Sequence, residues 1–344
     1  MRGLVVEKNG IIHLADDIPM PEIGPYEALV KIECCMICNG TDMEIIKGGI
    51  TEAQRFPLVL GHEGVGIVVR KGEKVCSYQI GDRVLRASLP DSEHYYSGWG
   101  SFCEYGVVKD SAAMLRDGYS FEEASGSLTQ QVTAPDITPE QAALMITLKE
   151  TCSALMRMGV ERGDRVLVVG DGPVGLCMLS ICRLLAIEAD MVGNHRENLE
   201  IAKRIGAAGI YWNKDFEKMH HLREERKKYF DFYIDTVGTP QTIRQGLPLV
   251  REDGMVAVYG LRTGQELGIP LEGVRNVTLK FVQWPIPKEE MKTHALVEQG
   301  IREKKINTEF LISHRMELKD FEKGFQAIRE KRALKVVLFM ENNA

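Results

Sequence analysis

The first third of the chain alternates short apolar runs with turn residues. Gly, Pro or charged residues bound each run, which is typical of β-strands separated by turns. The runs are Leu4–Val6, Glu27–Glu33, Gly64–Val69, Asp82–Leu85 and Phe102–Val108. Because no strong helical pattern interrupts them, the sequence predicts an all-β, barrel-like unit up to about residue 115.

From Thr138 the pattern changes to alternating helices and strands. Thr138 in the N-cap position and Pro139 in the first helical position predict a helix that continues to Met158. Apolar strands are then predicted at 165–170, 189–193, 232–235 and 255–259, with helices at 174–185 and 197–205. Alternation of this kind predicts an α/β fold with a doubly wound parallel sheet.

Two helices, at 289–304 and 318–332, and a strand at 334–340 are predicted to close the chain. The chain has 344 residues, which is too long for one ordinary hydrophobic core. Two domains are therefore expected. The charged cluster at 220–228 is interpreted as the solvent-exposed face of a helix.

Composition limits the class of partner. Lys and Arg total 43 against 49 Asp and Glu, a net charge of −6, which argues against a nucleic-acid or anionic-membrane binder. The longest apolar stretch, 166–182, contains Asp171 and a Gly-Pro break, so no membrane span is expected. The N-terminus lacks a signal-peptide pattern, and eight cysteines fit a reducing compartment. We therefore expect a cytoplasmic protein with a small-molecule substrate.

A glycine-rich turn separates the strand at 165–170 from the helix that follows. The turn reads G-x-G-x-x-G, in which the first glycine allows a tight turn, the second lets the backbone approach a pyrophosphate, and the third allows close packing of helix on strand. The helix N-terminus then offers free N–H groups to the phosphates. The predicted dinucleotide-binding residues are Gly170, Gly172, Pro173, Val174 and Gly175.

The end of the next strand indicates which dinucleotide is bound. An acidic residue usually stands there and binds the ribose 2′-hydroxyl, but this chain has Gly193. We interpret Gly193 as leaving room for a 2′-phosphate, with Asn194, His195 and Arg196 supplying donors and positive charge. NADP is therefore favoured and NAD stays possible; alternatively, Arg196 merely lies on the helix surface.

Residues at the ends of the later strands are candidates for the nicotinamide half of the coenzyme, because ligands of doubly wound sheets bind at the carboxyl ends of the strands. They are Asp235, Thr236, Gly238, Gly260 and Leu261.

A cysteine and a histidine–glutamate pair offer metal chemistry in the β-rich part. Cys38, His62 and Glu63 form a zinc set of three ligands with an open fourth position, the arrangement of a catalytic site. Zinc there would polarise a substrate hydroxyl. The alternative is a buried thiol and a hydrogen-bonded histidine without metal. The other seven cysteines are expected to pack.

Taken in order, several motifs resemble the zinc-type medium-chain dehydrogenases, and within them the sorbitol, threonine and sugar dehydrogenase branch. The motifs are Cys38 before Thr41-Asp42, Gly61-His62-Glu63, Gly81-Asp82-Arg83-Val84, the glycine turn and the segment 314–339. The resemblance implies a GroES-like β-barrel catalytic domain at 1–150 and 288–344, interrupted by a Rossmann domain at 151–287. It places the active site in the cleft between the two.

The resemblance also implies residue roles. Cys38 and His62 would bind zinc, Glu63 would bind it or lie behind it, and Thr41 would pass on a proton. Asn39 and Gly40 lengthen the usual spacing between the cysteine and the hydroxyl residue. Ile146 stands where many members carry a further ligand, and Glu150, one helical turn on, is a candidate replacement. Between Leu85 and Phe102 there is no cysteine, so a structural zinc is not expected.

The expected function is a zinc-dependent oxidoreductase that transfers a hydride between NAD(P) and the secondary hydroxyl or carbonyl of an alcohol, polyol or sugar. The aromatic stretch 91–99 is a candidate for the substrate side, and a homodimer or homotetramer is expected. One alternative is a zinc-free NADPH-dependent reductase of the same superfamily. Another is a nonenzymatic NADP-binding or sensor protein, which the missing ligand at Ile146 favours.

Overall fold

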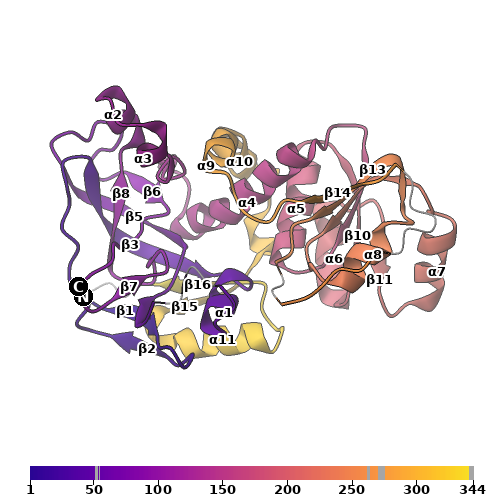
Figure 1. The fold of residues 1–344 in the computed structure, drawn as a ribbon, viewed down its shortest axis with the longest axis horizontal. Helices are drawn as coiled ribbons and strands as arrows, with labels where there is room; N and C mark the ends of the chain where they lie inside the picture. Colours follow the sequence, from indigo (N-terminus) through magenta and orange to yellow (C-terminus); the bar gives the residue numbers. More distant parts are fainter. Residues whose placement is uncertain (51–52, 54, 262–263, 270–275, 341–344) are drawn as a thin grey trace. The chain divides into compact units, whose positions relative to one another are not determined.

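Two compact units make up the chain (Figure 1). A computed structural model describes residues 1–340 except 51, 52, 54, 262, 263 and 270–275. The first unit comprises Met1–Thr147, Pro287–Glu298 and Ile312–Ala344, and the second comprises Leu148–Ile286 and Gln299–Leu311. Residues 299–311 thus belong to the second unit although they lie in the expected segment 288–344. The end of that segment, 341–344, lies outside the described residues.

The first unit is built from two β-sheets. A four-stranded sheet has the order β2-β1-β4-β7, and a second sheet has the order β15-β16-β3-β5-β6, with β8 also paired to β3. Alternate residues of the long central strands are buried in one apolar core that includes Val30, Ile32 and Val68. The strands are β1 (Gly3–Val6), β2 (Ile12–Ala15), β3 (Glu27–Ile37), β4 (Leu58–Val59), β5 (Glu63–Lys71), β6 (Arg83–Leu85), β7 (Tyr96–Ser97), β8 (Tyr105–Lys109), β15 (Ile312–Glu317) and β16 (Lys335–Phe339).

The first unit also contains helices, and two of them, α4 and α10, continue from the first unit into the second. They are α1 (Thr41–Ile46), α2 (Ser111–Arg116), α3 (Phe121–Ser125), α4 (Pro139–Met158), α9 (Pro287–Glu290), η2 (Met291–Thr293), α10 (His294–Arg302), η4 (Leu318–Asp320) and α11 (Phe321–Arg329). The predicted helix 139–158 agrees with α4. The predicted helix 289–304 is interrupted at η2, where the Thr293 hydroxyl donates to the Glu290 carbonyl at 2.8 Å and competes with the helical ladder.

The second unit is a parallel sheet of six strands in the order β11-β10-β9-β12-β13-β14, as a doubly wound fold requires (Figure 1). The strands are β9 (Arg165–Val169), β10 (Glu188–Gly193), β11 (Ile210–Trp212), β12 (Phe230–Asp235), β13 (Val250–Val258) and β14 (Thr278–Phe281). The helices are α5 (Pro173–Leu184), α6 (Arg196–Ile205), α7 (Phe216–Glu224) and α8 (Pro240–Gly246), with a 3-10 turn η3 (Thr308–Phe310). The α/β prediction is confirmed.

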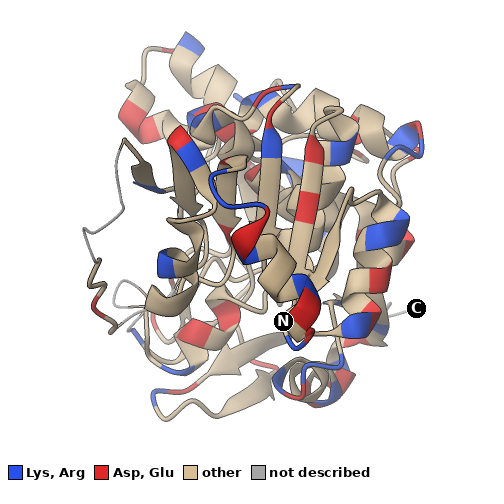
Figure 2. Cartoon of the chain, turned by 90° about the vertical axis from the view of Figure 1, so that its right-hand side faces the viewer, with Lys and Arg blue, Asp and Glu red and all other residues tan. Residues whose placement is uncertain are grey.

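Surface properties agree with the composition in most respects. Acidic and basic residues are mixed along the same elements (Figure 2). None of the helices in the described parts of the chain has the length and apolar character needed to cross a bilayer. All eight cysteines are free, and six of them are buried. The expectation that every cysteine except Cys38 packs is wrong for Cys76, which is exposed.

Candidate functional site

Three strands bring distant parts of the sequence to one end of the larger sheet of the first unit. Strand β3 ends at Ile37, next to Cys38, and its antiparallel pairing with β5 sets Met36 opposite Glu63. Strand β16 pairs with β3 on the other side, with Val336 opposite Ile37, so Lys335 comes to the same end. Strand pairing therefore gathers residues from three separate regions of the chain.

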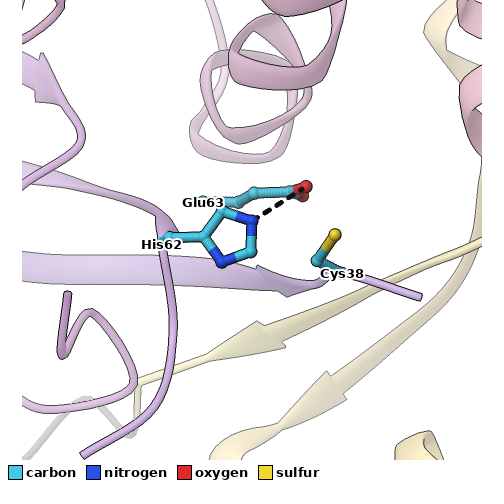
Figure 3. Close-up of side chains that lie close together, drawn as sticks. All are labelled: Cys38, His62 and Glu63. Atoms are coloured by element: carbon cyan, nitrogen blue, oxygen red, sulfur yellow. Dashed lines mark ion pairs between the residues drawn. The ribbon is translucent and has the colours of Figure 1, made fainter. Parts of the chain in front are cut away.

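Cys38, His62 and Glu63 converge at this end of the sheet (Figure 3). One candidate ligand atom from each lies within 4.8 Å of the others, and His62 Nε2 is 4.0 Å from Glu63 Oε1. His62 and Glu63 are buried and Cys38 is half-buried. Thr41 is the first residue of helix α1, and Glu150 is not part of this three-residue group.

Asp42 lies behind His62, on the side away from Glu63. It is fully buried; its Oδ1 lies 3.3 Å from His62 Nδ1, and its Oδ2 accepts a hydrogen bond from the Cys38 backbone N–H at 2.9 Å. Burial alone would lower the pKa of His62, but the neighbouring Asp42 and Cys38 raise that pKa well above its usual value. Asp42 thus favours a positive charge next to the imidazole, whether a proton or a metal supplies it.

Glu63 has a different set of partners. The ammonium of Lys335, itself buried, donates to both carboxylate oxygens at 2.5 and 2.6 Å, and the Thr147 hydroxyl donates to Oε1 at 3.1 Å. Ile146, the preceding residue of α4, is fully buried. Helix α4 therefore contributes a hydroxyl that binds Glu63 where a further metal ligand would be expected.

The donor set fits a divalent cation. A thiolate, an imidazole nitrogen and a carboxylate are typical zinc ligands. His62 Nδ1 and Asp42 Oδ1 are buried and face each other at 3.3 Å without a hydrogen bond of good geometry. An imidazole that binds a metal through Nε2 usually donates from Nδ1 to such a carboxylate, so a bound metal would give these two atoms a use. Of the three candidate ligands, Glu63 is already paired with the ammonium of Lys335, so Cys38 and His62 are the stronger candidates.

An aromatic side chain lies next to the cluster. The ring of Trp99 is centred 5.4 Å from the ring of His62 and is 45% exposed. Trp99 ends the stretch 91–99 that the sequence offered as the substrate side. The indole thus gives the cluster an apolar neighbour that is open to solvent.

The glycine turn of the second unit is tightly packed on one side and open on the other. Gly170 has φ +111°, and a Cβ on Gly175 would lie 1.8 Å from the Gly170 carbonyl oxygen. A Cβ on Gly172 would meet no atom within 4 Å, and Gly172 precedes Pro173 at the start of helix α5 without a side-chain cap. Open space thus adjoins the N-terminus of a twelve-residue helix, where anions bind.

The end of β10 differs from the expectation. We expected Gly193 to leave room for a 2′-phosphate, but a Cβ at Gly193 would lie 2.5–2.6 Å from the side chain of Asp171. Asp171, the variable residue after the first glycine of the turn, fills this space and is 4% exposed. The interpretation of Gly193 as vacant room is therefore wrong, because another residue of the same motif occupies it.

Asn194 and Arg196 lie in one cluster with residues of the neighbouring strand. The guanidinium of Arg196 lies 3.9 Å above the ring of Trp212, and the Trp212 indole N–H donates to the Asn194 carbonyl at 3.1 Å. The Asn213 amide donates to Asn194 Oδ1 at 3.1 Å. Both Asn194 and Arg196 are exposed, so Arg196 is held over an aromatic ring yet stays open to a ligand.

The candidates for the nicotinamide half have structural contacts. The Asp235 carboxylate is fully buried and accepts bonds from the N–H groups of Val237 and Gly238 at 2.8 and 3.0 Å. Burial raises its pKa, against the effect of these bonds. The Thr236 hydroxyl donates to the Val169 carbonyl at 2.9 Å. Asp235 thus stabilises the turn after β12.

Gly238 and Gly260 are in close contact, since a Cβ on Gly238 would lie 2.2 Å from the Gly260 carbonyl oxygen. Leu261 is half-buried. These residues shape the loops at the carboxyl ends of β12 and β13, which is where the sequence placed them.

Sequence reasoning did not assign a role to several residues of these sites. They are Asp42, Thr147, Asp171, Trp212, Asn213 and Lys335. Asp42 and Asp171 lie inside motifs described in the sequence analysis. Each is acidic at a position where a neutral residue would suffice, and this was a signal of a role that sequence reasoning could have used. Lys335 gave none, because it lies 272 residues from Glu63 in sequence.

Comparisons with known proteins cover nearly the whole chain. Residues 24–117 match the alcohol dehydrogenase GroES-like domain, and residues 173–296 match the zinc-binding dehydrogenase family. A sorbitol dehydrogenase from Halalkalibacterium halodurans is 27% identical over 98% of this chain and 99% of its own length. An L-threonine 3-dehydrogenase from Anaeromyxobacter sp. (strain K) is 26% identical over 98% of each.

Among solved structures, zinc-dependent alcohol dehydrogenase 2 from Streptococcus pneumonia is 25% identical, with a TM-score of 0.78 over 100% of this chain and 99% of that one. An alcohol dehydrogenase from Thermus sp. ATN1 is 24% identical, with a TM-score of 0.79 over 99% and 100%, and shares the fold. The two family matches and the full-length relatives agree with the sheets described above: the chain belongs to the zinc-type medium-chain dehydrogenase superfamily.

Proposed function

We propose that this NAD(P)-dependent dehydrogenase oxidises the secondary hydroxyl of an alcohol, polyol or sugar, or reduces the matching carbonyl, with the help of one zinc ion. The observation that carries the proposal is the convergence of Cys38, His62 and Glu63 with Asp42 behind the histidine. The sorbitol and threonine dehydrogenases among its relatives support the substrate class.

Each residue of the cluster has a distinct task. The Cys38 thiolate and His62 Nε2 hold the metal, while Asp42 keeps the imidazole in the tautomer that leaves Nε2 free to bind. Bound zinc supplies a Lewis acid that lowers the pKa of the substrate hydroxyl. Thr41 would accept the released proton while it gives up its own hydroxyl proton to solvent, and Glu63 would contribute either a third ligand or a nearby negative charge that Lys335 balances.

The second unit binds the coenzyme. Gly170, Gly172, Pro173, Val174 and Gly175 take the pyrophosphate at the N-terminus of α5. Asn194, His195 and Arg196 bind the adenosine end and favour NADP over NAD, and the loops with Gly238 and Gly260 take the nicotinamide end. The coenzyme supplies the hydride acceptor or donor.

Metal analysis of the purified protein tests the zinc proposal. About one zinc per chain is expected, and removal by a chelator should abolish turnover of alcohols, polyols or sugars, followed by NADPH absorbance. Cys38→Ser and His62→Ala should lose the metal while they keep coenzyme binding. Less than about a tenth of an equivalent, with activity retained, would reject the proposal.

A second candidate is a zinc-free reductase of the same superfamily. Two observations favour it: Lys335 donates to both oxygens of Glu63, and Ile146 offers no ligand. Such an enzyme would reduce an activated double bond or carbonyl with NADPH, and its activity would be insensitive to chelators.

We also propose a homo-oligomer. Strand β14 lies at one edge of the parallel sheet, and edge strands present unpaired backbone groups that another chain can pair with. Phe281, Trp284 and Ile286, in and after this strand, are all exposed. An exposed apolar group beside an edge strand is typical of a subunit interface.

A further inference from the structure

Asp171 and His195 form a pair at the adenosine end of the expected coenzyme site. Asp171 Oδ2 accepts a hydrogen bond from the His195 backbone N–H at 2.6 Å, and His195 Nδ1 lies 3.2 Å from both carboxylate oxygens. The Asn198 side-chain amide donates to the Asp171 carbonyl at 2.9 Å. The turn of the glycine motif is thereby fastened to the start of helix α6.

The pair is buried on one side and open on the other. The Asp171 side chain is 6% exposed, whereas the His195 side chain is 36% exposed. Because Nδ1 faces the carboxylate, Nε2 on the opposite edge of the ring points away from it. The imidazole, and not the carboxylate, is therefore the group that a ligand can reach.

The surroundings of the ring favour an anion. Arg196, the next residue, is exposed and stacked over Trp212, and Asn194 is exposed beside it. A phosphate would accept a stronger hydrogen bond from the Nε2 edge and from Arg196 than a ribose 2′-hydroxyl would, because the phosphate carries negative charge.

We propose that Asp171 is a positioning residue that fixes the His195 imidazole so that its Nε2 edge, with Arg196, binds the 2′-phosphate of NADP. The proposal rests on the assignment of the second unit as the coenzyme-binding unit. The Asp171 carboxylate would then favour NADP indirectly, by holding His195. In direct contact with the 2′-phosphate, the same carboxylate would repel the phosphate.

The test compares direct binding of NADPH and NADH by coenzyme fluorescence, without substrate. It uses the full-length wild type, Asp171→Asn, His195→Ala and the double variant. In each single variant the Kd for NADPH should rise about tenfold, as expected for one charge-assisted hydrogen bond. The Kd for NADH should change less than about twofold. The double variant should lose no more than either single variant, because both act through the same ring.

Two controls make the result specific. Glu200→Gln removes an exposed carboxylate from the same helix and should leave both Kd values unchanged. Competition with 2′,5′-ADP and 5′-AMP isolates the 2′-phosphate: only 2′,5′-ADP should bind more weakly to the variants. If Asp171→Asn impairs folding, His195→Ala, a change at a partly exposed side chain, must still show the NADPH-specific loss.

Opposite results would overturn the proposal. Tighter NADPH binding and weaker NADH binding by Asp171→Asn would show that the carboxylate itself contacts the ribose 2′-hydroxyl. Equal losses for both coenzymes would show a purely structural role. Because the binding measurement needs neither zinc nor substrate, a failure of the zinc-dehydrogenase proposal would appear as absent turnover with these binding ratios intact.

Discussion

Asp42 and Glu63 are buried carboxylates on either side of His62, and their partners set them apart. Asp42 faces the imidazole and the Cys38 backbone, whereas Glu63 faces the ammonium of Lys335. A carboxylate behind a metal-binding histidine orients the ring and raises its basicity. A carboxylate bound to lysine has less charge to offer a metal. The zinc affinity of the site should therefore depend strongly on Asp42, although this carboxylate lies behind the histidine and is not itself a proposed ligand.

Replacing Asp42 tests this dependence. Asp42→Asn should weaken zinc binding about 10- to 100-fold, because the amide cannot serve as the anionic partner of His62 Nδ1. Competition with a chromogenic chelator measures the affinity. Asp91→Asn, at an exposed carboxylate paired with Arg55, is the matched control and should leave zinc binding unchanged. Equal zinc affinity of Asp42→Asn and wild type would contradict the role given to Asp42.

Lys335 should matter for stability. Lys335→Met leaves the Glu63 carboxylate buried without its cation and should cost about 3–5 kcal/mol of the free energy of unfolding. Urea unfolding in the absence of metal measures the loss. Adding Glu63→Gln should recover most of it, since no unpaired charge then stays buried. Lys319→Met, at an exposed lysine, should have little effect; a similar loss there would show that the effect is not specific.

Residue types and local motifs predicted that Cys38, His62 and Glu63 belong to one site, because zinc ligands have strong chemical preferences. The structure brings the three side chains together, and their role as zinc ligands stays a prediction. Lys335 could not be found in this way, since only the pairing of β16 with β3 brings it to Glu63. The same limit applies to Gly193, whose free space depends on the side chain of Asp171.

The start of helix α5 separates two roles of glycine. A Cβ at Gly175 would collide with the Gly170 carbonyl, so Gly175→Ala should destabilise the second unit, as measured by thermal unfolding. A Cβ at Gly172 would enter open space, so Gly172→Ala should fold with a nearly unchanged Tm. Its coenzyme Kd should rise at least about tenfold, because the methyl group blocks approach to the pyrophosphate. Unchanged coenzyme binding by Gly172→Ala would place the pyrophosphate elsewhere.

Asp231 links three adjacent strands of the parallel sheet. On β12 it accepts bonds from Arg165 of β9 at 2.8 and 3.1 Å and from Arg251 of β13 at 2.5 Å. Burial raises the pKa of Asp231, but the two arginines outweigh this and lower it to about 2. A carboxylate with a lowered pKa stabilises the fold above its unfolded pKa, near 4, and loses that effect as the pH falls towards 2.

The expected result is a pH-dependent difference between Asp231→Asn and wild type. At pH 7 the variant should be less stable by about 1 kcal/mol, a value kept small because both arginines are partly exposed and water screens the pairs. The difference should shrink between about pH 4 and pH 2. Thermal unfolding at several pH values measures it, with Glu217→Gln as a surface control. A difference independent of pH would exclude the ionised carboxylate as the cause.

Elements with a continuous apolar core were predicted, and short edge elements were not. Strands β9, β10 and β12 and helix α4 gave clear patterns because one or both faces are buried. Strand β11 has three residues and β14 has four, and both lie at the edges of the sheet with few buried side chains. An edge strand lacks the apolar pattern that burial imposes, so sequence periodicity misses it.

The chain crosses between its two units more than once. A β-rich unit that resumes after the Rossmann unit was expected from the closing segment, and the first unit of the structure includes Pro287–Glu298 and Ile312–Ala344. The return of Gln299–Leu311 to the second unit was not expected. Helix α10 supplies the reason: Gly300 within it packs against Leu184 of α5, a contact that no local pattern signals.

The exposed edge at β14 leads to a prediction about assembly. Light scattering of the purified chain should give the mass of a dimer or tetramer. Phe281→Glu, at a residue that is 54% exposed, should shift the mass towards that of a monomer, because charges at sheet edges oppose pairing. Phe216→Glu, at a residue 89% exposed on helix α7, is the control and should keep the wild-type mass. A monomeric wild type would contradict the proposed interface.

The contact between Asp171 and Gly193 restricts the order in which related sequences can diverge. Positions 171 and 193 share one volume, so an acidic side chain cannot be introduced at 193 while Asp171 is present. Asp171 must first become glycine, because its Cβ is the atom nearest to a Cβ at 193, and that step alone would release His195. A switch of coenzyme therefore requires two substitutions in a fixed sequence, with an intermediate that has lost the recognition of NADP without gaining that of NAD. This epistasis would tend to preserve whichever preference a lineage already has.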